Sequence, residues 1–226
     1  MAKKILGFVS MVVAAVMFSL VAARADTNTH FRYANTFVKQ INQDWTVYLY
    51  QEFNFDGDHH HDLLGVCNEP GVVYSGLAKW LDITLAACTY HGKTNSEWQG
   101  QVVPYVAGTL KWTLAGFDIS NKSRIEYDQR NYKLYDRWRY RDVFSIVAPY
   151  KWTLFQIQPF VANELYYDFQ AHYLTGNQLK MGIQFPVVKH VSALIWYMRD
   201  MSHSNLPDDS HWKTTPTVGF ETVISF

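Results

Sequence analysis

Three features are scarce in this chain, and each absence narrows the class of protein. Beyond Val21 no apolar run approaches the roughly 18 residues that a membrane-spanning helix requires, which excludes a helical membrane protein. Basic residues do not outnumber acidic ones (20 of each), whereas a nucleic-acid-binding protein would usually be basic. The chain has two cysteines, and neither lies directly after the candidate signal cleavage site, so a lipoprotein anchor is not indicated.

The amino end has the pattern of a secretory signal peptide. Lys3 and Lys4 precede an apolar stretch over 5–21, and Ala23-Arg24-Ala25 forms an Ala-x-Ala cleavage site. We predict cleavage after Ala25, which leaves a single domain over 26–226. That domain has 17 basic and 20 acidic residues, a net charge of −3.

The carboxyl end carries the second informative pattern. Residues 217–226 alternate and end on an aromatic residue, which is typical of the last strand of an outer-membrane β-barrel of a Gram-negative bacterium. Phe220, Ile224 and Phe226 are expected to face lipid and to form the signal that the barrel-assembly machinery reads. Without a spanning helix, such a chain can cross a membrane only as a closed barrel, because lipid offers no partner to a free sheet edge.

A soluble periplasmic β-sandwich or lipocalin-like barrel is the alternative, since alternation alone does not show which face of a strand contacts water. The turn pattern favours the membrane barrel. Four segments with Lys beside Trp or His are predicted as periplasmic turns, and five polar or glycine-rich segments as outer loops. The turns are 78–81, 110–114, 150–154 and 188–191, and the loops are 56–70, 91–100, 131–136, 170–177 and 202–212.

This alternation of turns and loops predicts an all-β antiparallel barrel of about ten strands, with eight or twelve as alternatives. Both chain ends are expected on the periplasmic side. The predicted strands are 44–55, 71–80, 82–91, 100–111, 113–130, 136–148, 156–169, 177–187, 190–201 and 213–226.

The most charged part of the chain lies in the predicted strands 113–130 and 136–148. Their charged residues occupy alternate positions, which places them on one face of each strand. They are Arg124, Glu126, Asp128, Arg130, Arg137, Arg139 and Arg141. Because a lipid-facing arginine at the bilayer midplane costs roughly 2–4 kcal/mol, these side chains are expected to face the lumen.

A loop centred between Lys133 and Leu134 would set the pairing of these charges. It places Asp128 opposite Arg139, and it places Glu126 opposite Arg141. Alternation adds Glu164 and Lys180 to the inner face. The same register turns Asp142 outward, which would require a local bulge.

These residues resemble a family of small outer-membrane proteins that carry a domain of unknown function. The similar motifs are 124–127, 137–141, 163–165 and 177–182, and the resemblance covers roughly Trp45 to the carboxyl end. Gln178 departs from the pattern, since that family more often has Arg there. The resemblance implies a barrel in the outer membrane, with outer-membrane lipid around it, and little about chemistry.

Two functional classes compete for the charged lumen. In the first, the barrel is structural or envelope-associated, and paired charges fill a small interior. In the second, Arg137, Arg139 and Arg141 line a narrow channel that attracts small anionic solutes. The acidic residues of the same face would cancel much of that field, which favours the first class.

A lipid-modifying enzyme is the third class. Ser202-His203-Ser204-Asn205 contains a nucleophile and a base, but adjacent strand residues point to opposite faces. The segment therefore indicates a polar loop, and we predict neither catalytic residues nor a cofactor.

Two further motifs invite specific chemistry. Residues 56–62 include His59-His60-His61, and imidazole suits zinc or copper, but three consecutive histidines do not converge on one ion, so no metal site is predicted. Cys67 and Cys88 are an even pair in an oxidising compartment. With a turn centred near Trp80, Cys88 would face residue 72, which disfavours a disulfide unless the loop before Pro70 folds back.

Overall fold

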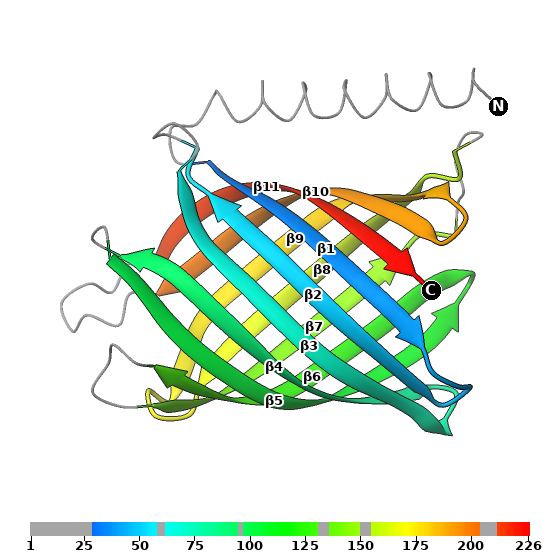
Figure 1. Ribbon diagram of the computed structural model, residues 1–226, viewed down its shortest axis with the longest axis horizontal. Helices are drawn as coiled ribbons and strands as arrows, with labels where there is room; N and C mark the ends of the chain where they lie inside the picture. Colours follow the sequence, from blue (N-terminus) through cyan, green and yellow to red (C-terminus); the bar gives the residue numbers. More distant parts are fainter. Residues whose placement is uncertain (1–28, 58–61, 95–96, 131–135, 150–154, 204–211) are drawn as a thin grey trace.

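A computed structural model describes residues 29–57, 62–94, 97–130, 136–149, 155–203 and 212–226. In these residues, eleven strands close into one barrel in the order β1-β11-β10-β9-β8-β7-β6-β5-β4-β3-β2 (Figure 1). The strands are β1 (His30–Gln40), β2 (Trp45–Phe55), β3 (Leu63–Ala78), β4 (Leu81–Thr94), β5 (Glu97–Leu114), β6 (Phe117–Arg130), β7 (Arg137–Val147), β8 (Gln158–Asp168), β9 (Tyr173–Val188), β10 (Val191–His203) and β11 (Trp212–Ser225). The predicted all-β barrel is confirmed. No helix in the described part of the chain is long and apolar enough to cross a membrane.

The strand count differs from the predicted ten by one strand, β1. The turn that joins β1 to β2 lacks the motif of Lys next to Trp or His that marked the predicted turns. Instead the Asn42 side-chain carbonyl accepts the backbone N–H groups of Asp44 (2.9 Å) and Trp45 (3.0 Å). Such a turn is built by one side chain, and the repeated pattern of the other turns does not identify it.

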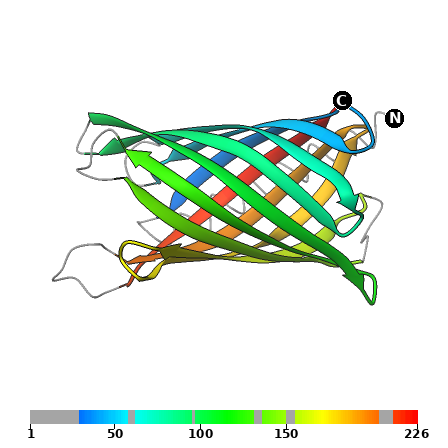
Figure 2. The same cartoon turned by 90° about the horizontal axis from the view of Figure 1, so that it is seen from below.

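The odd count forces one parallel pair at the closure of the barrel. Antiparallel neighbours alone can close only an even number of strands, and here the arrows of β1 and β11 point the same way (Figure 1). His30 lies beside Thr217 and Phe37 beside Ile224. The blue and red strands from the two ends of the chain lie side by side in the turned view (Figure 2). β1 therefore starts at the end of the barrel opposite to Phe226. The prediction that both chain ends lie on one side is wrong for the described residues.

Two of the four predicted turns lie where expected, at 79–80 and 189–190. The segment 110–114 belongs to β5, and the turn is at Ala115 and Gly116, whose φ angles are 51° and 85°. Two successive positive φ angles define the tight hairpin turn that matches strand twist, and glycine adopts such a φ without strain. The segment 150–154 lies outside the described residues.

Strands also replace parts of the predicted loops. β3 begins at Leu63, so 63–70 is strand, and β4 and β5 extend over all but the tip of the predicted loop 91–100. β8 ends at Asp168, and a short turn joins it to β9. The Asp168 carboxylate stabilises this turn by accepting hydrogen bonds from the backbone N–H groups of Gln170 (2.9 Å) and Ala171 (3.1 Å). Of the predicted loop 170–177, the part from Tyr173 onward is strand.

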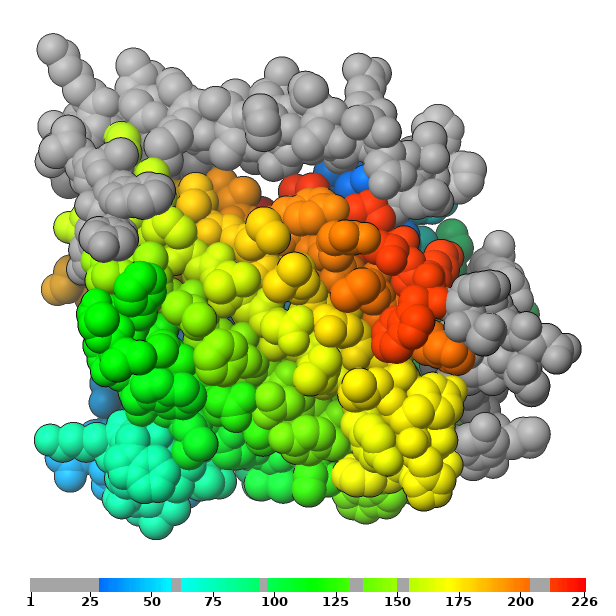
Figure 3. Space-filling view, turned by 180° about the vertical axis from the view of Figure 1, so that it is seen from behind, coloured from blue at the N-terminus to red at the C-terminus, as the bar shows by residue number. Residues whose placement is uncertain are grey.

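The outer surface has an apolar band between two sets of exposed tryptophans. At the end with short turns, Trp45, Trp80 and Trp112 are 42–57% exposed, and at the other end, the loop end, Trp98, Trp138 and Trp212 are 46–52% exposed. Exposed apolar side chains lie between them, including Val47, Leu49, Leu85, Val106, Ile125 and Met181. In space-filling form β6 to β10 make a continuous outer wall (Figure 3).

Candidate functional site

The charged residues meet in the lumen along the β6–β7 pair. Glu126 faces Arg139 and Asp128 faces Arg137, so the predicted register is wrong by two residues. A shift of two residues keeps every side chain on its face, and here it also pairs each carboxylate with an arginine. Periodicity and charge therefore do not distinguish the two registers.

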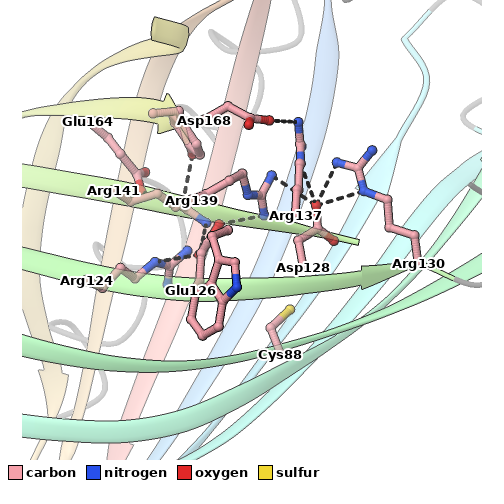
Figure 4. A network of polar contacts seen from close by, with 12 residues as sticks. Cys88, Arg124, Glu126, Asp128, Arg130, Arg137, Arg139, Arg141, Glu164 and Asp168 are labelled. Carbon is pink, nitrogen blue, oxygen red and sulfur yellow. Dashed lines mark hydrogen bonds and ion pairs between the residues drawn. The ribbon is translucent and has the colours of Figure 1, made fainter. Parts of the chain in front are cut away.

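Asp128 is the first of two carboxylate centres and has no exposed surface. Its Oδ2 lies 2.6 Å from Arg130 Nη2, 2.9 Å from Arg137 Nε and 3.6 Å from Arg139 Nη1 (Figure 4). The last contact is the pair that the sequence predicted as directly opposite, and it is instead a longer diagonal contact.

Glu126 is the second centre and is equally buried. Its Oε1 lies 2.6 Å from Arg139 Nη2, and its Oε2 lies 3.0 Å from Arg124 Nε and 3.7 Å from Arg141 Nη1. Arg139 thus joins the two centres into one network. Burial away from water makes each of these contacts stronger than a surface ion pair, and makes loss of any partner costly.

Residues of β8 and β3 extend the network on both sides. Arg137 Nη1 lies 2.8 Å from Asp168 Oδ2, and Arg141 Nε donates to Glu164 Oε1 at 2.7 Å. Arg124 Nη1 lies 3.8 Å from Glu69 Oε2. The structure thus brings together eight of the predicted lumenal residues, all except Lys180.

Glu69 is a member that sequence reasoning missed, because 63–70 was predicted to be a loop. Its Oε1 accepts hydrogen bonds from Tyr48 (2.9 Å) and Tyr105 (2.5 Å). The alternation of Cys67 and Glu69 with outward residues was the available signal. Pro70 and two nearby glycines mask that signal, because these residue types usually mark loops.

Side chains occupy only part of the lumen. A cavity of about 780 Å³ lies within it, lined by residues from the loop-end rim, such as His30 and Lys93, to the middle of the barrel. Seven of its lining residues are cationic and four are acidic. The cations are Arg32, Lys93, Lys122, Arg124, Arg139, Arg141 and Lys180, and the acids are Glu52, Glu69, Glu126 and Glu164. The cavity wall therefore has a net positive charge.

Two of these cations lie over aromatic rings instead of beside carboxylates. Lys122 Nζ lies 5.3 Å from the ring centroid of Tyr105, and Lys180 Nζ lies 4.5 Å from that of Trp196. Neither lysine makes an ion pair with any residue that the structure describes. A ring face attracts a cation only modestly, so these ammonium groups remain the best placed to bind an anion.

Asp142 does face outward, and no bulge is needed. The β6–β7 pairing is regular from Asp118 to Asp128. The Asp142 carboxylate accepts hydrogen bonds from Ser123 (2.6 Å), Asn121 (2.9 Å) and Tyr140 (3.1 Å) on the same outer face. Three donors offset the loss of water around this carboxylate.

Of the remaining sequence motifs, the structure describes only a part. Residues 58–61, with the three histidines, and Ser204 and Asn205 lie outside the described residues. His203 ends β10, where its ring contacts Tyr173 (centroids 5.3 Å apart) and Trp212 (5.8 Å). His203 therefore packs among aromatic rings at the rim.

The fold and its lumen together define a closed β-barrel protein with an ion-paired, partly hollow interior. Among known proteins, the chain belongs to the family described as protein of unknown function (DUF2490), whose model matches residues 27–211. This confirms the expected membership in a barrel family that carries a domain of unknown function. A search of curated proteins found no match.

Proposed function

We propose that this chain is an outer-membrane barrel whose cavity binds small anionic solutes. The membrane location is supported by the outer surface, where an apolar band lies between two sets of exposed tryptophans. Indole rings favour the two membrane interfaces, and the band between them matches the lipid-facing belt of outer-membrane barrels. On this proposal, the loop end with Trp98, Trp138 and Trp212 faces outward from the cell.

The last strand supports the same location. Its inward residue Gly219 faces Trp196 in the lumen, so Phe220 and Ile224 point outward, and Phe226 is 65% exposed. This is the arrangement expected of residues that contact lipid and that the barrel-assembly machinery recognises during insertion. Their role in assembly is a proposal that follows from the proposed location.

The observation that carries the solute proposal is a cavity of about 780 Å³ whose wall includes two lysines without ion-pair partners in the described residues. Within a low-dielectric wall, an unpaired ammonium attracts an anion more strongly than it would in water. Cation rings and pockets of this kind select anions in pores. A small carboxylate or phosphate group matches this site in charge and size.

The arginine row 137, 139 and 141 is not the preferred anion site. Arg137 contacts two carboxylates and Arg139 contacts two, so their charge is already balanced. This balance favours a second candidate function for that half of the wall, a structural network that holds β6, β7 and β8 together. The two functions are compatible, because neither lysine takes part in an ion pair of the network, although Lys122 shares the Tyr105 ring with Arg124.

Ion conductance and anion binding test the proposal together. The purified barrel is inserted in planar bilayers under a salt gradient, and binding of phosphate and of a small dicarboxylate is measured by calorimetry. We expect anion binding, or anion-selective conductance, that is lost in the double variant Lys122→Gln/Lys180→Gln. Lys111→Gln is the matched control, because Lys111 lies at the turn end and pairs with Asp82 at 2.7 Å.

A barrel that inserts but neither binds nor conducts anions would overturn the solute proposal and leave the structural function. Membrane location is tested separately by cell fractionation and by gel mobility with and without boiling. A protein absent from the outer-membrane fraction would overturn the location.

A further inference from the structure

Cys67 and Cys88 meet on the inner wall of the barrel. Cys67 in β3 faces Tyr90 in β4, so Cys88 is its diagonal neighbour on the same inward face. Their sulfur atoms are in contact, with Sγ–Sγ 2.6 Å, and both residues line the cavity. Cys88 lies on the wall below the charged network (Figure 4).

The register explains why the sequence disfavoured this pair. The turn at 79–80 moves the alignment by one residue and the shift between Tyr74 and Ala78 moves it by two more, so Val72 faces Leu85 and Cys88 aligns with residue 69 instead of 72. Extra residues in one strand of a hairpin form a bulge, which moves every later pair along the ladder. The objection that Cys88 lies too far from Cys67 for a bridge is therefore wrong.

We propose that Cys67 and Cys88 form an intramolecular disulfide that joins β3 to β4 in the exported protein. The oxidising compartment follows from the proposed outer-membrane location, where disulfides form and persist. The pairing geometry does not depend on that location.

The surroundings favour a structural bond over a reactive dithiol. Reactive cysteines lie in exposed, electropositive sites, because the thiolate is the reacting species. Cys67 is only 7% exposed, and its directly facing neighbour in β2 is Glu52. Glu69 is the next inward residue of β3. The negative charge of these carboxylates disfavours a thiolate at Cys67, which argues against a reactive dithiol. A metal site is a separate alternative, and two sulfur ligands alone do not form one.

The bond forms by thiol–disulfide exchange with a disulfide-bearing thiol oxidoreductase of the envelope. One cysteine thiolate attacks the oxidant's disulfide and forms a mixed disulfide, releasing one oxidant thiolate. The second cysteine thiolate then attacks the first cysteine's sulfur and expels the oxidant's other sulfur. The pair loses two protons and two electrons, and the oxidant leaves as a dithiol.

The bond would close a ring that contains the register shift and the turn at 79–80. It would thereby fix the alignment of an irregular hairpin whose inward residues line the cavity. Glu69, which holds Tyr48 and Tyr105, lies beside the bond and would be held at the wall. Reduction should then lower the temperature at which the folded barrel converts to the unfolded gel band.

The test uses the full-length protein extracted from cell envelopes under acid quench. Free thiols are blocked with a maleimide-linked polymer in denaturant, with and without prior reduction, and the intact mass is measured. We expect no polymer adducts before reduction, two after it, and a mass lower by two hydrogen atoms than that of the reduced chain. Two adducts without reduction would overturn the proposal.

The control keeps two cysteines and moves one across the wall. In Cys88→Ala/Thr89→Cys the new sulfur lies one residue away on the outer face, because strand neighbours alternate. This variant should give two adducts without reduction.

To separate the bond from the location, the reduced, unfolded chain is folded in detergent in the presence of oxidised glutathione, so that both thiols are accessible before the barrel closes. Loss of both thiols in the parent, but not in the control, supports the pairing whatever the cellular location. Stable glutathione adducts on the parent would overturn it.

Discussion

Glu126 and Arg139 face each other directly across β6 and β7, with Oε1 and Nη2 2.6 Å apart, and Glu126 has no exposed surface. The same glutamate also contacts Arg124 and Arg141, so three arginines share one buried carboxylate, and each has a second carboxylate contact. This relationship makes Glu126 the residue on which the lumenal network depends most.

Glu126→Ala should destabilise the folded barrel by about 3–5 kcal/mol, because it removes one of two carboxylate contacts from each of three largely buried arginines. The measurement is reversible urea unfolding in lipid vesicles, followed by tryptophan fluorescence. Asp82→Ala is the control, since its partner Lys111 is 44% exposed and such pairs contribute about 0–1 kcal/mol. Equal losses in the two variants would contradict a buried network.

Double-mutant cycles should distinguish the observed register from its alternative. Coupling between Glu126 and Arg139 should be large within the range of about 0.5–3 kcal/mol for contacting residues, and coupling between Glu126 and Arg141, 3.7 Å apart, should be smaller. Each residue is changed to alanine singly and in pairs. A larger coupling to Arg141 would support the register predicted from the sequence.

Gly219→Ala should cost about 1–3 kcal/mol through overpacking. A Cβ at Gly219 would lie 2.1 Å from Cζ2 of Trp196, so the indole ring would have to leave its place beside Lys180. Gly108→Ala is the matched control, because a Cβ there has no atom of the structure within 4 Å. Unchanged stability in Gly219→Ala would show that the ring lies elsewhere.

Asp142→Asn should leave stability unchanged within about 0.5 kcal/mol or raise it, although the residue is hydrogen-bonded. The amide oxygen still accepts from Ser123, and on the proposed membrane location the outer wall faces lipid, where removing a charge lowers the cost of desolvation. The same change at Glu126, to Gln, should be clearly destabilising, because three arginines lose the negative charge that they share. Urea unfolding of both variants in vesicles checks the contrast, and equal losses would place Asp142 in a charged environment.

Much of the fold could be predicted from the sequence because a barrel strand has a short local period. Alternation in β6, β7 and β11 was sufficient to assign their inner and outer faces, and the turns at 79–80 and 189–190 carried a recognisable residue pattern. β1 was missed because the turn before Trp45 is built by Asn42 alone. The start of β3 was missed because Pro70 and nearby glycines indicate a loop.

The candidate site was predictable as a set of residues but not as a set of contacts. Alternation placed Arg124, Glu126 and Arg139 on one face, and all three meet. Their pairing depends on the centre of a loop, and a two-residue slip preserves both face and charge. Glu69 was missed because Pro70 and nearby glycines hide the start of β3, and the meeting of the two cysteines depends on the register shift between Tyr74 and Ala78.

In the strands that it identified, the sequence by itself determined which side chains face inward, because the strand period of two is a property of neighbouring residues. It also determined that the interior is ionic and the exterior apolar. Only the tertiary structure decided the odd strand count, the parallel contact of β1 with β11, the register of β6 on β7 and the meeting of Cys67 with Cys88. These four features are relations between strands. They are set by the hydrogen bonding of whole strand pairs, by bulges and by the closure of the barrel, and the sequence of a single strand contains none of these constraints.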